Sequence, residues 1–429
     1  MLIVLILKGS DKMCEYIIKK SMPLSGRIQI SGAKNAALPA IAASYLTEDS
    51  VKLNNIPKLS DVNNMFEIAD EIGADILTES AAEYKILPRA EKFSLSYDTV
   101  SKLRGSFLFM GPLLAKYGKV KIPMPGGCRI GSRPVDLHLK GFSLMGADCV
   151  SGHGFISVKA PKLHGAQIYL DFPSVGATEN IMMAACLADG ETVIENAAAE
   201  PEISDLALML VSMGAKIDGI GTDTLKITGA KNLHGCTHSI IPDRIEAGTF
   251  MIAAVLTGGT VTLCGAQSEH IKPLTAKMRE IGVDVDEVEN CITVKSNSKL
   301  KSCDIKTMPF PGFPTDMQAQ FCALLSIVPG TSIITETVFE NRFMYVSELQ
   351  KMGAKIKIDG RTAVIEGTKK LSGARVSATD LRAGAALVVA GLAANGTTKI
   401  GNAGCIDRGY ENFDKKLSSL GAYVEKLIR

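Results

Sequence analysis

One motif occurs six times along this chain of 429 residues and constrains its fold more than any other feature. Each copy is an amphipathic stretch with helical periodicity that ends in glycine followed by alanine or valine, as in "LVSMGAKI" and "LQKMGAKI". A single glycine after a helix is only a common C-terminal cap, but six at intervals of 68 to 73 residues indicate duplication. The repeated glycines are Gly73, Gly146, Gly214, Gly282, Gly353 and Gly421.

The residues around each glycine predict the same structural unit. A small-residue helix such as "NAALPAIAASYL" opens the unit, and a glycine-rich turn with a β-branched strand, as in "GGTVTLCG", follows it. The amphipathic helix comes next, and then two short strands with polar turns. Because the first helix is apolar nearly all round, we expect it to be buried among neighbouring units. The sequence therefore predicts an α/β fold of six strand-helix-strand-helix-hairpin units, packed into two globular halves of three.

The boundary between the two halves is predicted from the start of the fourth unit. This unit begins after "HSIIPDRIEAG", so we place the crossing near Ile241. One predicted domain consists of residues 35–241, with three repeats and the loop around Cys128. The other combines residues 1–34, which contribute an N-terminal strand, with residues 242–429, which contain the last three repeats.

Charge, cysteine usage and the apolar start exclude several classes of protein. The 47 basic and 45 acidic residues leave a net charge of +2, which argues against a nucleic-acid-binding surface. The ten cysteines and six histidines show no metal-binding spacing, and most cysteines lie in apolar runs typical of reduced cytosolic thiols. The stretch Met1–Leu7 is too short to span a membrane and lacks the features of a secretory signal. We expect a cytoplasmic protein without metal, nucleic-acid or membrane partners, with an edge strand or a non-native extension ahead of Met13.

Cations stand at the starts of four predicted small-residue helices. Lys34, Arg104, Arg244 and Arg382 occupy these positions. A cation there costs up to about 1 kcal/mol, because a helix N-terminus already carries partial positive charge. Free backbone N–H groups and a basic side chain together make a phosphate or carboxylate site, so the pattern indicates bound anions. The alternative is that these side chains extend into water or pair with Asp and Glu.

The fifth unit departs from this pattern by placing Asp316 where the others place a cation. A carboxylate among cationic helix ends stays ionised and can accept a proton from a bound hydroxyl, although Thr315 or Asp316 is also a good N-cap. Asp380, in "SATDLRAG", is interpreted first as a cap of its helix and second as a catalytic group.

The stretch "PMPGGCRIGSRPVDLH" combines glycines and prolines with Cys128. Glycine gives a backbone freedom, proline limits its directions, and the segment therefore has the composition of a lid. Arg129 and Arg133 favour the thiolate, which is the reactive form of an exposed cysteine.

Eight motifs carry a resemblance to a known family. They are "SGAKNAALP", "PGGCRIGSRPVDLH", "PSVGATEN", "PDRIEAGTF", "GFPTDMQAQF", "ETVFENRFMYVSEL", "ATDLRAG" and "IDRGYE". Together they resemble the UDP-N-acetylglucosamine 1-carboxyvinyltransferases, which are enolpyruvyl transferases, from about Tyr16 to the C-terminus. The resemblance implies a two-domain inside-out α/β barrel, with three repeats per domain and the active site in the cleft between them.

The resemblance also implies an activity. Enolpyruvyl would pass from phosphoenolpyruvate to the 3′-hydroxyl of UDP-N-acetylglucosamine, with release of phosphate and without a metal or organic cofactor. This is the first committed step of peptidoglycan precursor synthesis, and it serves cell-wall biogenesis, cell shape and cell division.

Roles carry over from the resemblance to matching residues. Cys128 would be the general acid toward the methylene carbon, and Asp316 would take the proton of the attacking hydroxyl. Catalytic roles are implied for Cys128, Asp316, Lys34 and Arg408. Phosphoenolpyruvate contacts are implied for Lys34, Asn35, Arg133, Arg342, Arg382 and Arg408. Nucleotide-sugar contacts are implied for Arg104, Arg133, Pro134, Val135, Asp136, Leu137, Ser174, Val175, Gly176, Asp316 and Val338.

One departure and two alternatives accompany the resemblance. Phe172 and Pro173 stand before the Ser-Val-Gly motif, where some relatives carry a basic residue. A sister enolpyruvyl transferase acts on shikimate 3-phosphate, but its first motif resembles Gly-Ser-Lys-Ser followed by arginine, whereas this chain has "GAKNAAL". A non-catalytic protein that binds nucleotide sugars would need neither the acid Cys128 nor the base Asp316.

Overall fold

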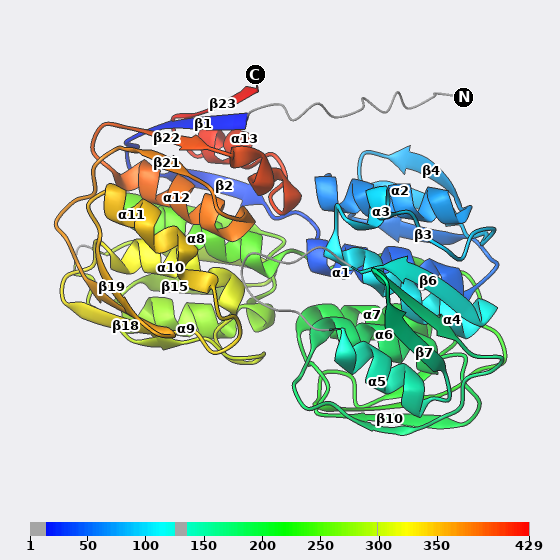
Figure 1. The fold of residues 1–429 in the computed structure, drawn as a ribbon. Coiled ribbons are helices and arrows are strands. Elements are labelled where there is room, and N and C mark those ends of the chain that lie inside the picture. Colours follow the sequence, from blue (N-terminus) through cyan, green and yellow to red (C-terminus); the bar gives the residue numbers. More distant parts are fainter. Residues whose placement is uncertain (1–13, 125–134, 298, 429) are drawn as a thin grey trace.

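The computed structural model describes residues 14–124, 135–297 and 299–428. Within these residues the strands form six small sheets, and Figure 1 shows them divided between two lobes. The N-terminal strands lie in the lobe that also contains the C-terminal part of the chain (Figure 1).

Three sheets belong to the lobe formed by the first three repeats. Their strands are β3 (Val51–Asn54), β4 (Asp75–Ser80), β5 (Glu83–Leu87), β6 (Lys119–Pro123), β7 (Asp148–Gly152), β8 (Phe155–Lys159), β9 (Gln167–Tyr169), β10 (Glu191–Glu195), β11 (Lys216–Asp218), β12 (Thr224–Thr228) and β13 (Thr237–Ser239). The strand orders are β13-β3-β5-β4, β11-β12-β10-β9 and β6-β8-β7. In the first two sheets an antiparallel hairpin is extended by one parallel strand. In the third, a single bridge between Ser94 and Lys121 stands in place of that strand.

The other three sheets include both N-terminal strands. Their strands are β1 (Cys14–Lys19), β2 (Ser25–Gln29), β14 (Thr260–Cys264), β15 (Asp284–Val288), β16 (Cys291–Lys295), β17 (Ile305–Lys306), β18 (Thr331–Thr335), β19 (Lys355–Asp359), β20 (Thr362–Glu366), β21 (Arg375–Ser377), β22 (Thr397–Gly401) and β23 (Val424–Ile428). The strand orders are β21-β22-β1-β23, β15-β16-β14-β2 and β17-β18-β20-β19. Strand β1 is therefore inserted between two strands from the C-terminal repeat, and β2 runs parallel to β14.

The small-residue helices are buried, as their apolar composition predicts. They are α1 (Lys34–Ala43), α4 (Met110–Tyr117), α6 (Val175–Ala185), α8 (Arg244–Thr257), α10 (Gln318–Leu325) and α12 (Leu381–Ala393). All residues of α10 and all but the two end residues of α12 are buried. Helices α8, α10 and α12 contact one another in one lobe, and α4 contacts α6 in the other.

The amphipathic helices end at the six repeated glycines, which confirms the six-unit prediction. These helices are α2 (Ser60–Ile72), α5 (Asp136–Leu144), α7 (Pro201–Ser212), α9 (Lys272–Glu280), α11 (Val346–Lys351) and α13 (Phe413–Ser419). Every one of the six glycines has a positive φ, between 91° and 128°, a conformation that residues with a Cβ rarely adopt. The remaining helical segments are α3 (Tyr97–Val100) and the 3₁₀ turns η1 (Ser44–Leu46), η2 (Arg104–Phe109), η3 (Ser268–His270), η4 (Thr315–Met317), η5 (Arg342–Tyr345) and η6 (Ala403–Arg408).

The buried apolar residues separate into two cores. One extends from Ala33 to Ile240, and the other combines residues 14–30 with residues 245–422. The domain boundaries expected near residues 34 and 241 stay a prediction, which this division supports. Within the part of the chain that the structure describes, no helix combines the length and apolar character needed to cross a membrane.

Candidate active site

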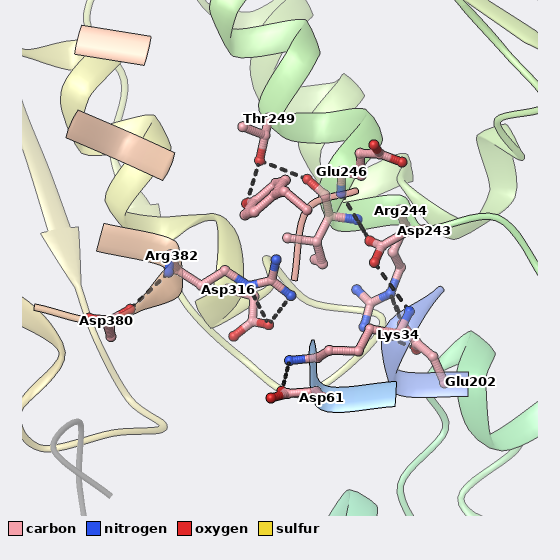
Figure 2. A network of polar contacts seen from close by, with 12 residues as sticks. Lys34, Asp61, Glu202, Asp243, Arg244, Glu246, Thr249, Asp316, Asp380 and Arg382 are labelled. Atoms are coloured by element: carbon pink, nitrogen blue, oxygen red, sulfur yellow. Dashed lines mark hydrogen bonds and ion pairs between the residues drawn. The ribbon is translucent and has the colours of Figure 1, made fainter. Parts of the chain in front are cut away.

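A cluster of charged side chains joins the two lobes. Among the described residues it contains four cations and two carboxylates, namely Lys34, Arg342, Arg382, Arg408, Asp61 and Asp316. The elements α1 and α2 of one lobe supply Lys34 and Asp61, and segments of the other lobe supply the rest. Figure 2 shows Lys34, Asp61, Asp316 and Arg382 within one polar network. Its four cations exceed its two carboxylates by two, and by one if Asp243 beside Lys34 is included, so the cluster can receive an anionic ligand.

Lys34 is the first residue of α1 and is buried. Its Nζ lies 3.2 Å from Oδ2 of Asp61, and its backbone N–H donates to Oδ2 of Asp243 at 3.4 Å. Burial lowers the pKa of Lys34, Asp61 opposes this shift, and the charges of Arg382 and Arg408 lower the pKa further. The ammonium group is therefore held among other cations in a desolvated position, where an added anion stabilises it strongly.

Asp316 lies in η4 and accepts hydrogen bonds from two arginines. Its Oδ1 is 2.9 Å from Nη2 of Arg342, and its Oδ2 is 3.0 Å from Nε of Arg382. Both arginine side chains are buried, whereas Asp316 keeps part of its surface exposed. The predicted capping role is replaced by this arginine pairing, because η4 has Pro314 at its N-cap and shows no side-chain cap.

Arg382 retains a donor within this arrangement. Its Nη1 is buried and has no hydrogen-bond partner among the described residues, while its guanidinium carbon lies 5.3 Å from the centre of the Tyr410 ring. Burial by itself lowers the pKa of Arg382, but Asp316 and Tyr410 raise it, so this side chain is a permanent cation. Asp380 caps α12 by accepting the backbone N–H groups of Arg382 at 2.9 Å and Ala383 at 3.1 Å, the role that its position favoured.

The helix-end cations have carboxylate partners within the protein. Lys34 pairs with Asp61, Arg382 with Asp316, and Arg244 with Glu202, where Nε of Arg244 lies 3.0 Å from Oε1. Each of these three cations pairs with Asp or Glu, which is the alternative to anion binding that the sequence left open. Their positions at helix starts therefore do not by themselves require a bound anion. The site argument rests instead on the cation surplus around Asp61 and Asp316.

Several residues predicted to hold a nucleotide sugar lie at the starts of α5 and α6, whereas Asp316 and Val338 belong to the other lobe. Arg104 begins η2, and burial together with the charge of Arg104 lowers the pKa of His138 on α5. A Cβ placed on Gly176 would lie 3.3 Å from Cε1 of His138, so α6 approaches this ring closely. Ser174 caps α6 by accepting the N–H of Ala177 at 3.4 Å.

The remaining predicted contacts are distributed as follows. Val135 precedes α5, Asp136 and Leu137 form its first turn, and Val175 begins α6. Asn35 is half-buried beside Lys34, and the N–H of Val338 donates to Oε1 of Glu336 at 2.8 Å in the other lobe. Cys128, Arg129, Arg133 and Pro134 lie outside the described residues, so their roles stay predictions.

Sequence reasoning missed Asp61, which joins Lys34 to Arg408. Its Oδ1 accepts from Nε of Arg408 at 2.8 Å while its Oδ2 faces Lys34. The only signal in the sequence is an acidic residue in the first turn of α2. Such a residue is ordinarily explained by the positive end of the helix, so it gave no reason to select Asp61.

Comparison with known proteins defines the class. The model of the EPSP synthase (3-phosphoshikimate 1-carboxyvinyltransferase) family matches residues 18–417, and the chain belongs to this family of enolpyruvyl transferases. The chain is 56% identical to UDP-N-acetylglucosamine 1-carboxyvinyltransferase 2 of Carboxydothermus hydrogenoformans, over 96% of this chain and 99% of the relative. It is also 56% identical to UDP-N-acetylglucosamine 1-carboxyvinyltransferase 1 of Caldanaerobacter subterraneus subsp. tengcongensis, with the same two coverages. The family resemblance inferred from the motifs is confirmed, and the chain is an enzyme of the transferase class.

Solved structures show the same fold. The enolpyruvyl transferase NikO from Streptomyces tendae matches with a TM-score of 0.88 at 24% identity, covering 97% of this chain and all of NikO (100%). EPSP synthase from Acinetobacter baumannii matches with a TM-score of 0.76 at 18% identity, again over 97% of this chain and 100% of the neighbour. The predicted fold class is therefore confirmed.

Proposed function

We propose that this chain transfers enolpyruvyl from phosphoenolpyruvate to the 3′-hydroxyl of UDP-N-acetylglucosamine and releases phosphate. Relatives that match over nearly their full length are named for this carboxyvinyl transfer. The reaction opens peptidoglycan precursor synthesis and so serves the bacterial cell wall. The family acts on small molecules, and both substrates proposed here are anions of the kind that the charged cluster can bind.

The observation that carries the proposal is the position of Asp316 between two buried arginines. Arg342 and Arg382 keep the carboxylate ionised, because each stabilises negative charge at a distance of about 3 Å. An ionised carboxylate at the edge of a cationic site can accept the proton of a hydroxyl group as that group attacks. Asp316 keeps part of its side chain exposed, so it lies at the surface of the site and not in the core.

The cations of the cluster have a separate role in the proposed reaction. Lys34, Arg382 and Arg408 would bind the phosphate and carboxylate of phosphoenolpyruvate, because charged donors of this kind suit these oxygens. Cys128 would protonate the methylene carbon, which lets the sugar hydroxyl add to the adjacent carbon. Loss of phosphate and of a methylene proton from the tetrahedral ketal then restores the double bond.

The nucleotide sugar would lie against the first lobe. Arg104 is close enough to His138 on α5 to influence its pKa, α6 approaches His138 at Gly176, and the two helix N-termini would provide backbone donors for phosphate oxygens. We also place the reaction in the cytoplasm, a proposal supported by nine described cysteines that are all free thiols.

The sister reaction on shikimate 3-phosphate is the nearest alternative. The family model is named for it, but the EPSP synthase structures that match share only 18% of the sequence and therefore speak for the fold alone. The full-length relatives at 48–56% identity are named for UDP-N-acetylglucosamine. A non-catalytic binding protein is also disfavoured, because such a protein has no use for an ionised carboxylate held beside the anion site.

The test is phosphate release from phosphoenolpyruvate in the presence of each acceptor. We expect release with UDP-N-acetylglucosamine and none above background with shikimate 3-phosphate. Mass spectrometry of the nucleotide product should show the added carboxyvinyl group. Release with shikimate 3-phosphate alone would assign the chain to the sister reaction, and release with neither acceptor would favour the binding protein.

A further inference from the structure

Two cysteines face each other on neighbouring strands of one sheet. Cys264 ends β14, Cys291 begins β16, and the two residues are direct partners in the antiparallel ladder. Partners of this kind have Cα atoms about 4.5 or 5.5 Å apart, and a disulfide requires a Cα separation of about 4.4–6.8 Å. Both cysteines are free thiols, so the strands hold a pair that can be joined without a change in backbone register.

An arginine contacts both sulfurs. Nη2 of Arg27 lies 3.5 Å from Sγ of Cys264 and 3.9 Å from Sγ of Cys291. Arg27 is on β2, the next strand of the sheet, where its ladder partner is Thr262. A guanidinium group at this distance stabilises a thiolate, the form of cysteine that reacts with electrophiles and oxidants.

The pKa of Cys264 is shifted in the opposite direction from the pKa values of seven other described cysteines. The hydrogen bond from Arg27 lowers the pKa of Cys264, and a hydrogen bond from Cys291 lowers it further. In contrast, burial raises the pKa of each of the other seven described cysteines apart from this pair, which are Cys14, Cys149, Cys186, Cys236, Cys303, Cys322 and Cys405. Cys186 and Cys322, for example, have pKa values raised to about 12.

The pair lies on the outer face of its sheet. Val261 and Leu263 of β14 are buried in the core, and so are Ile292 and Val294 of β16. Side chains alternate between the two faces of a strand, so Cys264 and Cys291 project away from the core. Both are partly exposed and Arg27 is exposed, which gives a small oxidant direct access.

We propose that Cys264 and Cys291 form a redox-active dithiol that reacts with hydroperoxides, with Arg27 as the residue that activates it. The Cys264 thiolate attacks one peroxide oxygen, an S–O bond forms, the O–O bond breaks, and the leaving hydroxide takes a proton from solvent. Cys264 is thereby oxidised to a sulfenic acid, and the peroxide is reduced. Cys291 then attacks the sulfenic sulfur, the S–O bond breaks, and the departing oxygen leaves as water with the thiol proton of Cys291. The product is the Cys264–Cys291 disulfide, which a dithiol reductant reverses.

None of the three residues belongs to the cluster around Asp61 and Asp316, so the proposal stands apart from the proposed function. The sequence drew attention to Cys128 because Arg129 and Arg133 stand beside it, and that expectation stays a prediction. The facing positions of Cys264 and Cys291 on neighbouring strands, and their shared contact with Arg27, become visible only in the fold.

The test uses the full chain and hydrogen peroxide at a small molar excess, followed by blocking of free thiols and a non-reducing tryptic map. Trypsin separates the pair cleanly, because Cys264 is the only cysteine of peptide 245–277 and Cys291 is the only cysteine of peptide 280–295. We expect these two peptides to become linked, with a loss of two hydrogen atoms, and to separate again after treatment with dithiothreitol. Oxidation at Cys128 falls in a different peptide and does not interfere.

Matched variants distinguish the roles of the three residues. Cys291→Ser should leave Cys264 as a sulfenic acid that dimedone traps, and Cys264→Ser should leave Cys291 reduced under the same treatment. Arg27→Gln should slow disulfide formation about three- to tenfold, and Arg27→Lys should restore part of the rate. Cys186→Ser serves as the control, because burial raises the pKa of that thiol and its loss should not change the rate. Unlinked peptides in the oxidised wild type, or an unchanged rate in Arg27→Gln, would overturn the proposal.

Discussion

Asp61 and Arg408 form a direct contact between the two lobes, with Oδ1 of Asp61 2.8 Å from Nε of Arg408 although 347 positions separate them in the sequence. The same carboxylate holds Lys34 through its second oxygen. Asp61 is almost fully buried, and its negative charge is compensated by the ion pairs with Lys34 and Arg408. One carboxylate thereby sets the spacing of two cations that are proposed to bind the same substrate.

We therefore predict that Asp61→Asn weakens catalysis without abolishing the fold. An amide keeps the shape but loses the negative charge, so Lys34 and Arg408 lose about 1.5–3 kcal/mol of charge-assisted hydrogen bonding. The expected result is a decrease of about tenfold to a hundredfold in kcat/KM for phosphoenolpyruvate, measured by steady-state phosphate release. Glu67→Gln is the matched control, because Glu67 lies on the same helix but pairs with Lys102 at the surface. Equal kinetics in the two variants would show that Asp61 does not position the cations.

A second prediction concerns Asp316. Asp316→Asn should lower kcat by about 10²- to 10⁴-fold, because an amide cannot accept the proton of the attacking hydroxyl. The change in KM should be small, since Arg342 and Arg382 remain in place. A decrease of less than tenfold in kcat would instead assign Asp316 to the positioning of the arginines.

His138 gives a prediction about stability. Burial, followed by the charge of Arg104, lowers its pKa to about 4, and Nδ1 faces the Asn180 amide at 2.9 Å. The unfolded chain takes up a proton at this histidine near pH 6.5, whereas the folded chain does so only near pH 4. The contribution of His138 to the free energy of unfolding should therefore fall as the pH decreases from about 6.5 to about 4, by up to about 3 kcal/mol. Urea unfolding at several pH values measures this contribution, which His138→Gln should remove and the exposed His153→Gln should leave in place.

Features that depend on adjacent residues could be predicted from the sequence, whereas contacts between residues far apart in the sequence could not. The repeated glycines and the buried helices α8 and α12 were predictable because a cap or an apolar surface is written into a few adjacent residues. The partners of Lys34 and Arg408 were not, because Asp61 is distant from both in sequence and resembles an ordinary first-turn carboxylate. In the same way, nothing local relates Arg27 to Cys264, which become neighbours only when β2 joins the sheet of β14.

The last prediction concerns Glu246, which should contribute to stability with the opposite sign to His138. Glu246 is buried on α8, where it accepts the N–H of Ser31 at 2.7 Å and contacts Nζ of Lys416 at 2.5 Å. Burial raises its pKa to about 7, even though Lys416 lowers it. Between about pH 4.5 and pH 7 the folded chain therefore keeps a proton that the unfolded chain has lost, and the free energy of unfolding falls as the pH rises, by up to about 3 kcal/mol.

The pH ranges in which Glu246 and His138 change the free energy of unfolding overlap. Between about pH 4.5 and pH 6.5 their contributions to that free energy therefore oppose each other. Glu246→Gln removes one of them, so its free energy of unfolding should rise with pH more steeply than that of the wild type across this interval. His138→Gln should show the reverse slope, and the double variant should return close to the wild-type slope, since the two sites lie in different lobes and should act additively. A wild-type slope in Glu246→Gln would contradict this prediction. It would show that the close contact with Lys416 keeps the carboxylate ionised throughout this pH range.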